Sequence, residues 1–364
     1  MKRILITGAG GTPSTNFVRS LRESGEDFYL IGIDCNEYFL QRAETDEKHL
    51  IPNADDPYYL QILRTIIQET HAELIYSQPD QEIFQISKHR ANLGIRTFLP
   101  KHQTIEICQN KFESFRCWEL AGLKVPKTIL IRDGSDLKYA FDQFKKPIWL
   151  RAITSPGGGK GSFRAENVDI ARTWIEFCEG WGKFTAAQCL EINSVTWTSL
   201  WSHGKLIVAQ GRKRLYWEFG DRVPSGVTGL TGTGITVADS IVDELALHAI
   251  HAIDKQPHGI FAVDFTYDSD GIPNPTEINI GRFFTTHLFF TSAGVNMPHI
   301  FVKLAFDEKV PMQKVNPLPT GLAWIRGMDF LPILTDIKNI IQSREELAAR
   351  REKIMDKSES ANKK

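Results

Sequence analysis

The sequence predicts an α/β domain followed by an α+β region, and three observations carry this prediction. The chain has 364 residues, which is more than one ordinary domain holds. Over the first hundred residues, short apolar runs alternate with helical patterns, as is typical of βαβ units and a parallel sheet. Beyond residue 184, apolar runs follow one another through tight turns, which indicates antiparallel strands.

Composition excludes several classes of protein. Hydrophobic residues make up 42% and charged residues 24% of the chain, a balance typical of globular proteins and not of fibrous or disordered ones. The formal net charge of −1 indicates no general attraction to nucleic acid or to an anionic membrane. No apolar run is long enough for a membrane span or a signal peptide. The odd number and wide spacing of the cysteines favour free thiols in a reducing cytoplasm: Cys35, Cys108, Cys117, Cys178 and Cys189.

The first hundred residues show the clearest alternation. In the segment 16–24, for example, Phe17, Val18 and Leu21 lie on one face of the expected helix. The expected strands are 3–7, 28–33, 74–76 and 97–99, and the expected helices are 16–24, 58–70 and 81–93. We therefore predict a Rossmann-like domain over residues 1–100.

The remaining residues change from alternation to antiparallel pairing. The expected helices are 111–120, about 135–145 and 235–253, and the expected strands are 128–131, 148–151, 184–190, 195–201, 205–212, 259–267 and 272–279. The last two strands form a hairpin around an Asp-Ser-Asp-Gly turn. The expected subdomains are 101–185, 186–310 and a C-terminal extension, 311–364, that is helix-favouring from about 343 and disordered over 358–364. The glycine-rich stretch 225–234 is expected to be a linker or a lid.

The first glycine turn, residues 8–13, follows a strand and precedes a helix. A dinucleotide-binding turn requires a third glycine where Pro13 stands, with an acid such as Asp34 on the ribose. No tyrosine has a lysine four residues later, which argues against an oxidoreductase. We therefore expect no NAD site here, but a turn at the ligand-binding edge of the sheet. Near that edge, Asp80 and Glu82 are expected either to hold an amine substrate or to begin a solvated helix.

A second glycine loop follows a strand that ends in a cation. Arg151 precedes a loop with Gly157, Gly158, Gly159 and Lys160. Glycines let backbone N–H groups approach phosphate oxygens, and both cations offset phosphate charge. A flexible surface loop is the alternative, and this segment alone does not decide between the two.

The C-terminal hairpin carries three oxygen ligands. Glu277 and Asn279 are two residues apart and therefore share one face of their strand, and Asp264 shares it if it pairs with residue 275 or 277. Carboxylates on strands this apolar need a partner. Mg²⁺ that bridges nucleotide phosphates prefers such oxygen ligands. The alternative is a solvated face of an edge hairpin.

Four features occur in one order along the chain: Lys111, the Arg151 strand with its glycine loop, the strand-rich segment 184–214, and the acidic hairpin. In this order and spacing they resemble the ATP-grasp superfamily. The resemblance covers about residues 2–305. It is greatest to a single synthetase unit of the carbamoyl phosphate synthetase large subunit, because Arg151 replaces the commoner lysine. It implies a Rossmann-like pre-ATP-grasp domain followed by a two-subdomain ATP-grasp fold.

The resemblance also implies site residues. ATP would lie between two subdomains, and its contacts would be Lys111, Arg151, Gly157, Gly158, Gly159, Lys160 and, from an adenine-binding hinge, Gln188, Leu190 and Glu191. Mg²⁺, or Mn²⁺ in its place, would be held by Asp264, Glu277 and Asn279. Arg282 would stabilise the transferred phosphate, although it follows Asn279 by three residues where many relatives have two. The hinge glutamates align poorly, so Glu191 is only a candidate ribose ligand.

One of the three consecutive cations Arg212, Lys213 and Arg214 is expected to face this site as a second catalytic cation, and strand alternation excludes all three. We select Arg212. The implied activity is a cytoplasmic ATP-dependent ligase that activates a carboxylate as an acyl phosphate and joins it to an amine. Small-molecule substrates are the expected partners, and a homodimer stays open. The alternatives are a bicarbonate-phosphorylating unit and a nucleotide-binding protein without chemistry.

Overall fold

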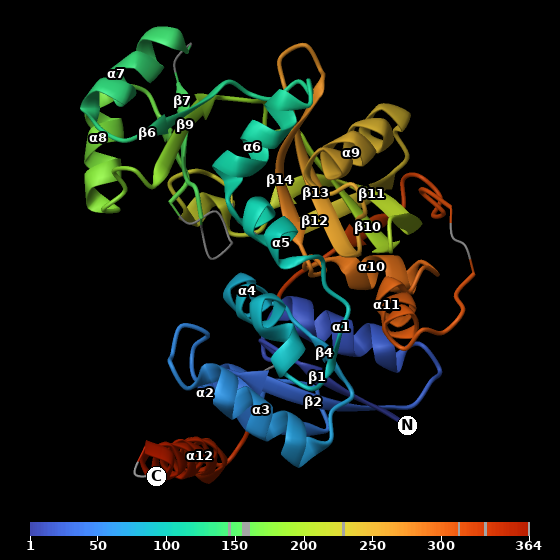
Figure 1. Ribbon diagram of the computed structural model, residues 1–364. Helices are drawn as coiled ribbons and strands as arrows, with labels where there is room; N and C mark the ends of the chain where they lie inside the picture. The colour runs from blue at the N-terminus through green and yellow to red at the C-terminus, as the bar shows by residue number, and fades with distance from the viewer. Residues whose placement is uncertain (145–146, 155–160, 228–229, 312–313, 331–332, 363–364) are drawn as a thin grey trace. The chain divides into compact units, whose positions relative to one another are not determined.

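The computed structural model describes residues 1–144, 147–154, 161–227, 230–311, 314–330 and 333–362 (Figure 1). The chain forms two compact units. Unit 1 comprises Met1–His102, Gly281–Pro311 and Met328–Lys364, and unit 2 comprises Gln103–Ile280 and Met312–Gly327. The sequence predicts consecutive domains, whereas the observed units are discontinuous because later segments return to unit 1.

Unit 1 is built on a five-stranded parallel sheet with the order β3-β2-β1-β4-β5. The chain runs outward from β1 on one side and then from β4 on the other, so the topological switch point lies between these two strands. The strands are β1 (Lys2–Ile6), β2 (Phe28–Asp34), β3 (Glu47–Leu50), β4 (Leu74–Tyr76) and β5 (Arg96–Thr97). This arrangement confirms the predicted α/β class.

The helices of unit 1 come from both ends of the chain. They are α1 (Thr12–Arg22), α2 (Glu37–Gln41), α3 (Tyr59–Thr70), α4 (Asp80–His89), α10 (His287–Ser292), α11 (Met297–Ala305) and α12 (Ile337–Asn362). α1 begins four residues before the predicted start, because Pro13 suits the first turn of a helix. The prediction of disorder over 358–364 is wrong up to Asn362, since α12 continues through this helix-favouring stretch. Four elements of unit 1 were not expected from the sequence: α2, β3, α10 and α11.

An aromatic cluster forms part of the core of unit 1. Phe17 of α1 stacks on Tyr76 of β4 with ring centroids 3.8 Å apart. Phe283 and Phe301 complete the cluster at centroid distances of 6.1 Å and 5.6 Å from Tyr76. Residues from the returning segment therefore complete a core that the first hundred residues begin.

The backbone of the first glycine turn is hydrogen-bonded and covered by residues at the end of β2 and after it. The Gly10 N–H donates to Asp34 Oδ2 (3.0 Å), and the Gly10 carbonyl accepts from Arg42 Nε (2.7 Å). A Cβ on Gly10 would lie 1.9 Å from the carbonyl oxygen of Phe39, so the backbone after Asp34 lies directly against the turn. The Asp34 carboxylate and the Gly10 backbone are therefore engaged within unit 1, and the absence of an NAD site stays a prediction.

Glu82 lies in the first turn of α4, but it does not lie in a solvated helix start. Its side chain is buried and accepts a hydrogen bond from the Tyr59 hydroxyl (2.9 Å). Burial raises the pKa of Glu82 to about 7, with the charge of Asp34 adding to the shift and hydrogen bonds from Thr7 and Tyr59 opposing it. The expectation that Glu82 holds an amine substrate is therefore not supported, because its carboxyl is turned into the core.

We expect Glu82→Gln to remove a pH-dependent loss of stability. A carboxyl whose folded pKa is raised contributes stability below its unfolded value of 4.5 and loses it as the pH rises through about 7. Glutamine keeps the acceptor for Tyr59 and does not titrate. The melting temperature of the variant minus that of the wild type should therefore rise by several degrees between pH 5 and pH 8 and then level off. A difference that stays constant across this range would contradict the assignment.

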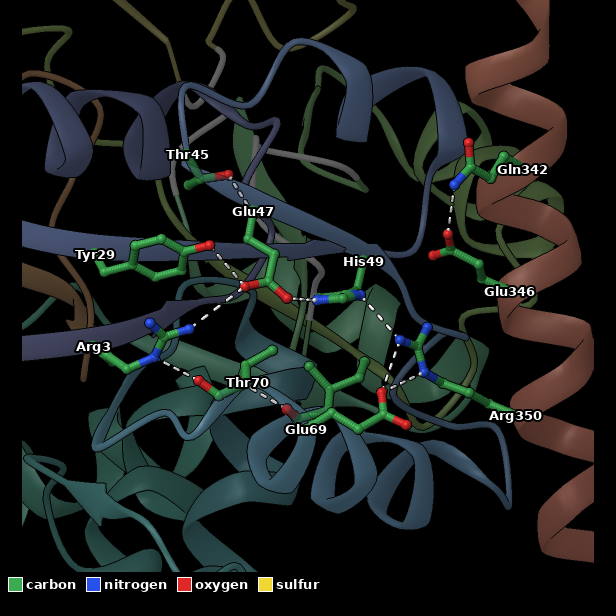
Figure 2. A network of polar contacts seen from close by, with 11 residues as sticks. Arg3, Tyr29, Thr45, Glu47, His49, Glu69, Thr70, Gln342, Glu346 and Arg350 are labelled. Carbon is green, nitrogen blue, oxygen red and sulfur yellow. Dashed lines mark hydrogen bonds and ion pairs between the residues drawn. The ribbon is translucent and has the colours of Figure 1, made fainter.

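α12, the C-terminal helix of unit 1, packs beside α2, α3 and β3 through a polar network (Figure 2). Arg350 Nη2 donates to His49 Nδ1 (3.1 Å) and to Glu69 Oε2 (3.0 Å), and His49 Nε2 lies 2.7 Å from Glu47 Oε1. Because a guanidinium only donates, Nδ1 of His49 must accept, and its proton resides on Nε2. Two further ion pairs join α12 to the rest of unit 1: Arg344–Glu37 and Arg351–Asp56.

Unit 2 contains two antiparallel sheets. The small sheet has the order β6-β9-β7-β8 and the large sheet the order β14-β13-β10-β11-β12-β15. The strands are β6 (Thr128–Ile131), β7 (Ile148–Ala152), β8 (Phe163–Ala165), β9 (Phe184–Gln188), β10 (Ser194–Ser202), β11 (Lys205–Trp217), β12 (Thr231–Val237), β13 (Gly259–Tyr267), β14 (Pro273–Ile280) and β15 (Ala323–Ile325). The helices are α5 (His102–Gln109), α6 (Lys111–Leu120), α7 (Gly134–Gln143), α8 (Val168–Phe177) and α9 (Ser240–Ile253).

Two expectations for unit 2 are wrong. The predicted helix 235–253 begins only at Ser240, where Asp239 accepts from the first backbone N–H groups as N-cap. Residues 231–234 of the glycine-rich stretch belong to β12, so this part is neither a linker nor a lid. β15, which pairs with β12, was not expected. No described helix is both long enough and apolar enough to traverse a lipid bilayer.

Candidate functional site

Three oxygen ligands converge on one face of the β13–β14 hairpin. Asp264 pairs directly opposite Glu277, with a β-bulge immediately beyond the pair. Asn279 Nδ2 donates to Asp264 Oδ2 (3.1 Å). The alternate residues of both strands point into the core and are buried: Val263, Phe265, Ile278 and Ile280. The predicted sharing of one face by Asp264, Glu277 and Asn279 is confirmed.

Two cations from other elements meet the same hairpin. Arg151, on β7 of the small sheet, donates from Nη2 to Glu277 Oε2 (2.6 Å) and from Nη1 to the Thr276 carbonyl (3.1 Å). Lys111, the first residue of α6, places Nζ 3.9 Å from the same Glu277 oxygen. Glu277 therefore joins the cation-bearing elements to the acidic hairpin.

The two carboxyls of the hairpin titrate in opposite directions. Burial by itself raises the pKa of Glu277, but the charges of Arg151 and Lys111 outweigh it and lower the pKa to about 2. Burial raises the pKa of Asp264, and the charge of Glu277 adds to that shift. Glu277 is thus a permanent anion at neutral pH, set between cations that an incoming polyanion would also attract.

Arg212 extends the site across the large sheet. It lies in one register row with Thr196 and Asp264. Its Nη2 donates to Thr196 Oγ1 (2.5 Å), which in turn donates to Asp264 Oδ1 (2.5 Å). Arg212 is only 1% exposed, and a Cβ on Gly234 of β12 would lie 2.9 Å from its Cδ. The absence of a side chain at Gly234 therefore allows Arg212 to lie flat on the sheet.

Arg214 lies on the same side of β11 as Arg212, and Lys213 on the other. Two of the three cations, Arg212 and Arg214, therefore face the site, whereas the sequence predicts that one of them does. Two further residues were not expected from the sequence: Thr196, which links Arg212 to Asp264, and Arg326, which follows β15. Alternation along β10 indicates a face for Thr196, but only strand pairing across about 70 residues shows that it stands beside Asp264.

The segment expected to bind adenine connects β9 of the small sheet to β10 of the large sheet. Gln188 ends β9, and the Glu191 N–H donates to the Tyr267 carbonyl (2.8 Å). The side chains of Gln188 and Glu191 are exposed, and Leu190 is half-buried. The segment is therefore placed between the two sheets as a hinge would be, and its contact with adenine stays a prediction.

Other expected site residues lie elsewhere. Arg282 and Asp80 both belong to unit 1 and form an ion pair, with Arg282 Nε 2.7 Å from Asp80 Oδ1. Asp80 therefore already pairs with a cation, and the role of Arg282 on a transferred phosphate stays a prediction. Gly157, Gly158, Gly159 and Lys160 lie outside the described residues.

The donor set fits Mg²⁺. Two carboxylates and one side-chain amide are hard oxygen ligands, and Mg²⁺ is usually held by one or two carboxylates together with phosphates and water. Among the described ranges, no group of three or more His, Cys, Asp or Glu side chains is placed to hold a metal. The hairpin set therefore depends on Asn279 and on oxygens that a nucleotide would supply.

Comparison with solved structures identifies the fold. The chain is similar to N5-carboxyaminoimidazole synthetase from Staphylococcus aureus complexed with ADP (TM-score 0.68, 18% identity, 86% of this chain and 79% of that one). It is also similar to the biotin carboxylase domain of 2-oxoglutarate carboxylase from Hydrogenobacter thermophilus (TM-score 0.67, 16% identity, 88% and 73%). A third similar structure is an L-amino acid ligase from Bacillus licheniformis (TM-score 0.64, 13% identity, 84% and 74%).

No family model matches the chain, and neither does any curated protein. At these identities the similarity establishes the fold and leaves the activity to be argued from the site. The predicted architecture is confirmed: this chain has the ATP-grasp fold.

Proposed function

We propose that the protein is an ATP-dependent ligase that activates a carboxylate and joins it to an amine. A carboxylate oxygen attacks the γ-phosphorus of ATP, the bond to the β,γ-bridging oxygen breaks, and ADP leaves. The amine then attacks the carbonyl carbon of the acyl phosphate, inorganic phosphate leaves, and the nitrogen loses a proton. These steps require positioning and charge neutralisation, with no covalent protein nucleophile.

One observation carries the proposal: Glu277 contacts cations from two other elements while it lies beside Asp264 and Asn279. Nucleotide phosphates would bind to Arg151 and Lys111, which are both largely buried. Mg²⁺ bound by Glu277, Asn279 and Asp264 would offset phosphate charge as the γ-phosphoryl group is transferred. Burial of these groups strengthens every electrostatic contact in the site.

The remaining residues take supporting roles. Arg212 fixes Asp264 through Thr196, and Arg282 would meet the transferred phosphate. The backbone of the segment 188–191 would bind adenine. Solved structures of similar fold include complexes with ADP, which supports a nucleotide in this site.

A second candidate function is phosphorylation of bicarbonate. It is favoured by the similarity to the 2-oxoglutarate carboxylase domain, which is described in complex with MgADP and bicarbonate. Both functions begin with attack of a carboxylate-like oxygen on ATP, so the same residues serve either substrate.

ADP release tests the proposal. The full chain with Mg²⁺ and ATP should release ADP faster when the correct acid is present, and faster again with the correct amine. The screen should cover bicarbonate, amino acids and sugar acids, each alone and in pairs. Bicarbonate-dependent release without an amine would favour the second function. Nucleotide binding without release in any combination would indicate a binding protein and contradict the proposal.

A further inference from the structure

Three arginine side chains of unit 2 converge on one threonine. Arg212 Nη1 donates to Thr231 Oγ1 (2.6 Å), and Arg214 Nε donates to the same oxygen (2.8 Å). Arg326 Nη1 donates to the Thr231 carbonyl (3.1 Å). Three positive charges thus meet around a residue that carries none. We call Arg212, Arg214, Arg326 and Thr231 the arginine cluster.

Most of this charge is held away from water. Arg212 is 1% exposed and Arg326 is 9% exposed. Like charges this close repel, and a buried guanidinium is costly unless an anion or good acceptors surround it. The effect is visible at Arg212: burial, together with the charges of Arg214 and Arg326, lowers its pKa to about 9, and Asp264 opposes this shift.

Arg214 is the member that is best placed to meet a ligand, because it is only half-buried. Its hydrogen-bond and ring partners are all neutral: Thr231, Ser194 at 3.5 Å, and the ring of Trp217, whose centroid lies 3.5 Å from Arg214 Cζ. The charges of Asp264 and Glu277 act on Arg214 without a hydrogen bond to it. Among the described residues, Nη2 of Arg214 has no hydrogen-bond partner. The Trp217 ring holds the guanidinium in place and leaves its outer edge available to an anion.

The cluster adjoins the proposed metal site, because the charges of Asp264 and Glu277 act on Arg214. The hydrogen bonds among described residues lead from Thr231 to Asp264 through the Arg212 guanidinium and the Thr196 hydroxyl. A ligand at Arg214 and Arg326 would therefore lie beside the metal site, with Arg212 next to it. A carboxylate gripped by several guanidinium N–H groups is a poor nucleophile, because its lone pairs are engaged. The group that would bind here is then not the carboxylate that attacks ATP.

We infer that the arginine cluster binds a second, non-reacting anionic group of a substrate, either a carboxylate or a phosphate. The inference rests on the proposed ligase function, because it adds a charge requirement to the substrates of that reaction. Either the acid carries a second anionic group, or the amine carries one, as an amino acid does. Neutral amines paired with simple monocarboxylic acids should be poor substrates.

Calorimetric titration of the full chain with succinate and with inorganic phosphate tests the binding site. A non-hydrolysable ATP analogue and Mg²⁺ should be present, so that the nucleotide phosphate site is filled. The wild type should bind at least one of the two anions. Arg214→Gln and Arg326→Gln should each raise the Kd of that anion at least about fivefold. Arg326→Gln should leave the Kd of the ATP analogue within about twofold, and Arg214→Gln, whose side chain also faces the proposed metal site, should raise it by a clearly smaller factor than the Kd of the anion. Arg164→Gln is the matched control, because its side chain is 56% exposed on β8 and belongs to neither site.

Three results would overturn the inference: no saturable anion binding by the wild type, unchanged anion binding in both variants, or equal weakening of anion and nucleotide. Arg326 is buried, so circular dichroism must show that its variant folds. Arg214→Gln keeps the test valid if Arg326→Gln does not fold.

The ADP-release assay then locates the anion. Amino acids compared with their amides test the amine, and dicarboxylic acids compared with monocarboxylic acids test the acid. If Arg214→Gln loses the preference for amino acids over their amides, the amine reaches the cluster; if it loses the preference for dicarboxylic over monocarboxylic acids, the acid does. If both preferences stay unchanged, the inference is contradicted. Because the calorimetry needs no turnover, failure of the ligase function and failure of the anion site are seen separately.

Discussion

Glu277→Gln lowers turnover at least about tenfold, a change of ~1.4 kcal/mol or more in the activation free energy. Glutamine has nearly the same size, but it is neutral and a weaker Mg²⁺ ligand. Arg151 and Lys111 would then lose the Glu277 carboxylate, so nucleotide phosphates alone should bind no worse. The expected signature is therefore a higher Mg²⁺ requirement and a lower kcat, without a matching rise in the Kd of metal-free ATP.

Titration of activity against Mg²⁺ at saturating ATP measures this effect. Glu244→Gln is the matched control, because Glu244 is exposed on α9. The melting temperature of Glu277→Gln without nucleotide should stay within about 3 °C of the wild type, since the carboxylate is partly exposed. Normal turnover in a folded variant would exclude Glu277 as a metal ligand.

Arg151→Ala weakens ATP binding at least about tenfold, because a buried cation aimed at a polyanion contributes strongly in a water-poor site. The same change removes the nearer of the two charges that lower the pKa of Glu277. It also removes a donor to the Thr276 carbonyl, which joins β7 to the hairpin. A small loss of stability without nucleotide is therefore expected beside the large loss of affinity.

Equilibrium binding and thermal melting of the same preparations separate the two effects. Arg151→Lys should recover part of the affinity, since it restores the charge but not the fork of N–H donors. Arg164→Ala, on the neighbouring strand, should match the wild type in both measurements. If Arg151→Ala melts far below the wild type and still binds ATP normally, the residue serves the fold alone.

The hairpin is the part of the site that local sequence pattern predicts well. Glu277 and Asn279 are two residues apart, and Asp264 lies across a short turn, so strand alternation places all three together. The alternating strands and helices of the first hundred residues predict the parallel sheet for the same reason. In both regions, the residues that determine the arrangement lie within one or two neighbouring strands or helices.

The parts that sequence reasoning missed depend on pairing between distant residues. Arg326 enters the large sheet because β15 pairs with β12, about 90 residues earlier. In isolation, residues 231–234 resemble a flexible glycine stretch, yet Gly232 and Gly234 lack side chains where Tyr216 and Arg212 lie across β12. α12 docks through arginines, which in the sequence alone resemble those of any solvated helix.

The discontinuous units also constrain how the chain is made. Phe17 and Tyr76 of unit 1 cannot pack against Phe283 and Phe301 until these two residues have been translated, about 200 residues later. At ~5–20 residues per second, a ribosome needs about 10–40 s to cover that distance. During this interval the early aromatic residues remain uncovered, while the contiguous stretch Gln103–Ile280 of unit 2 emerges in one piece and lacks the segment Met312–Gly327, which carries the edge strand β15. The nascent chain should therefore bind chaperones through its first hundred residues and release them once α11 has been synthesised.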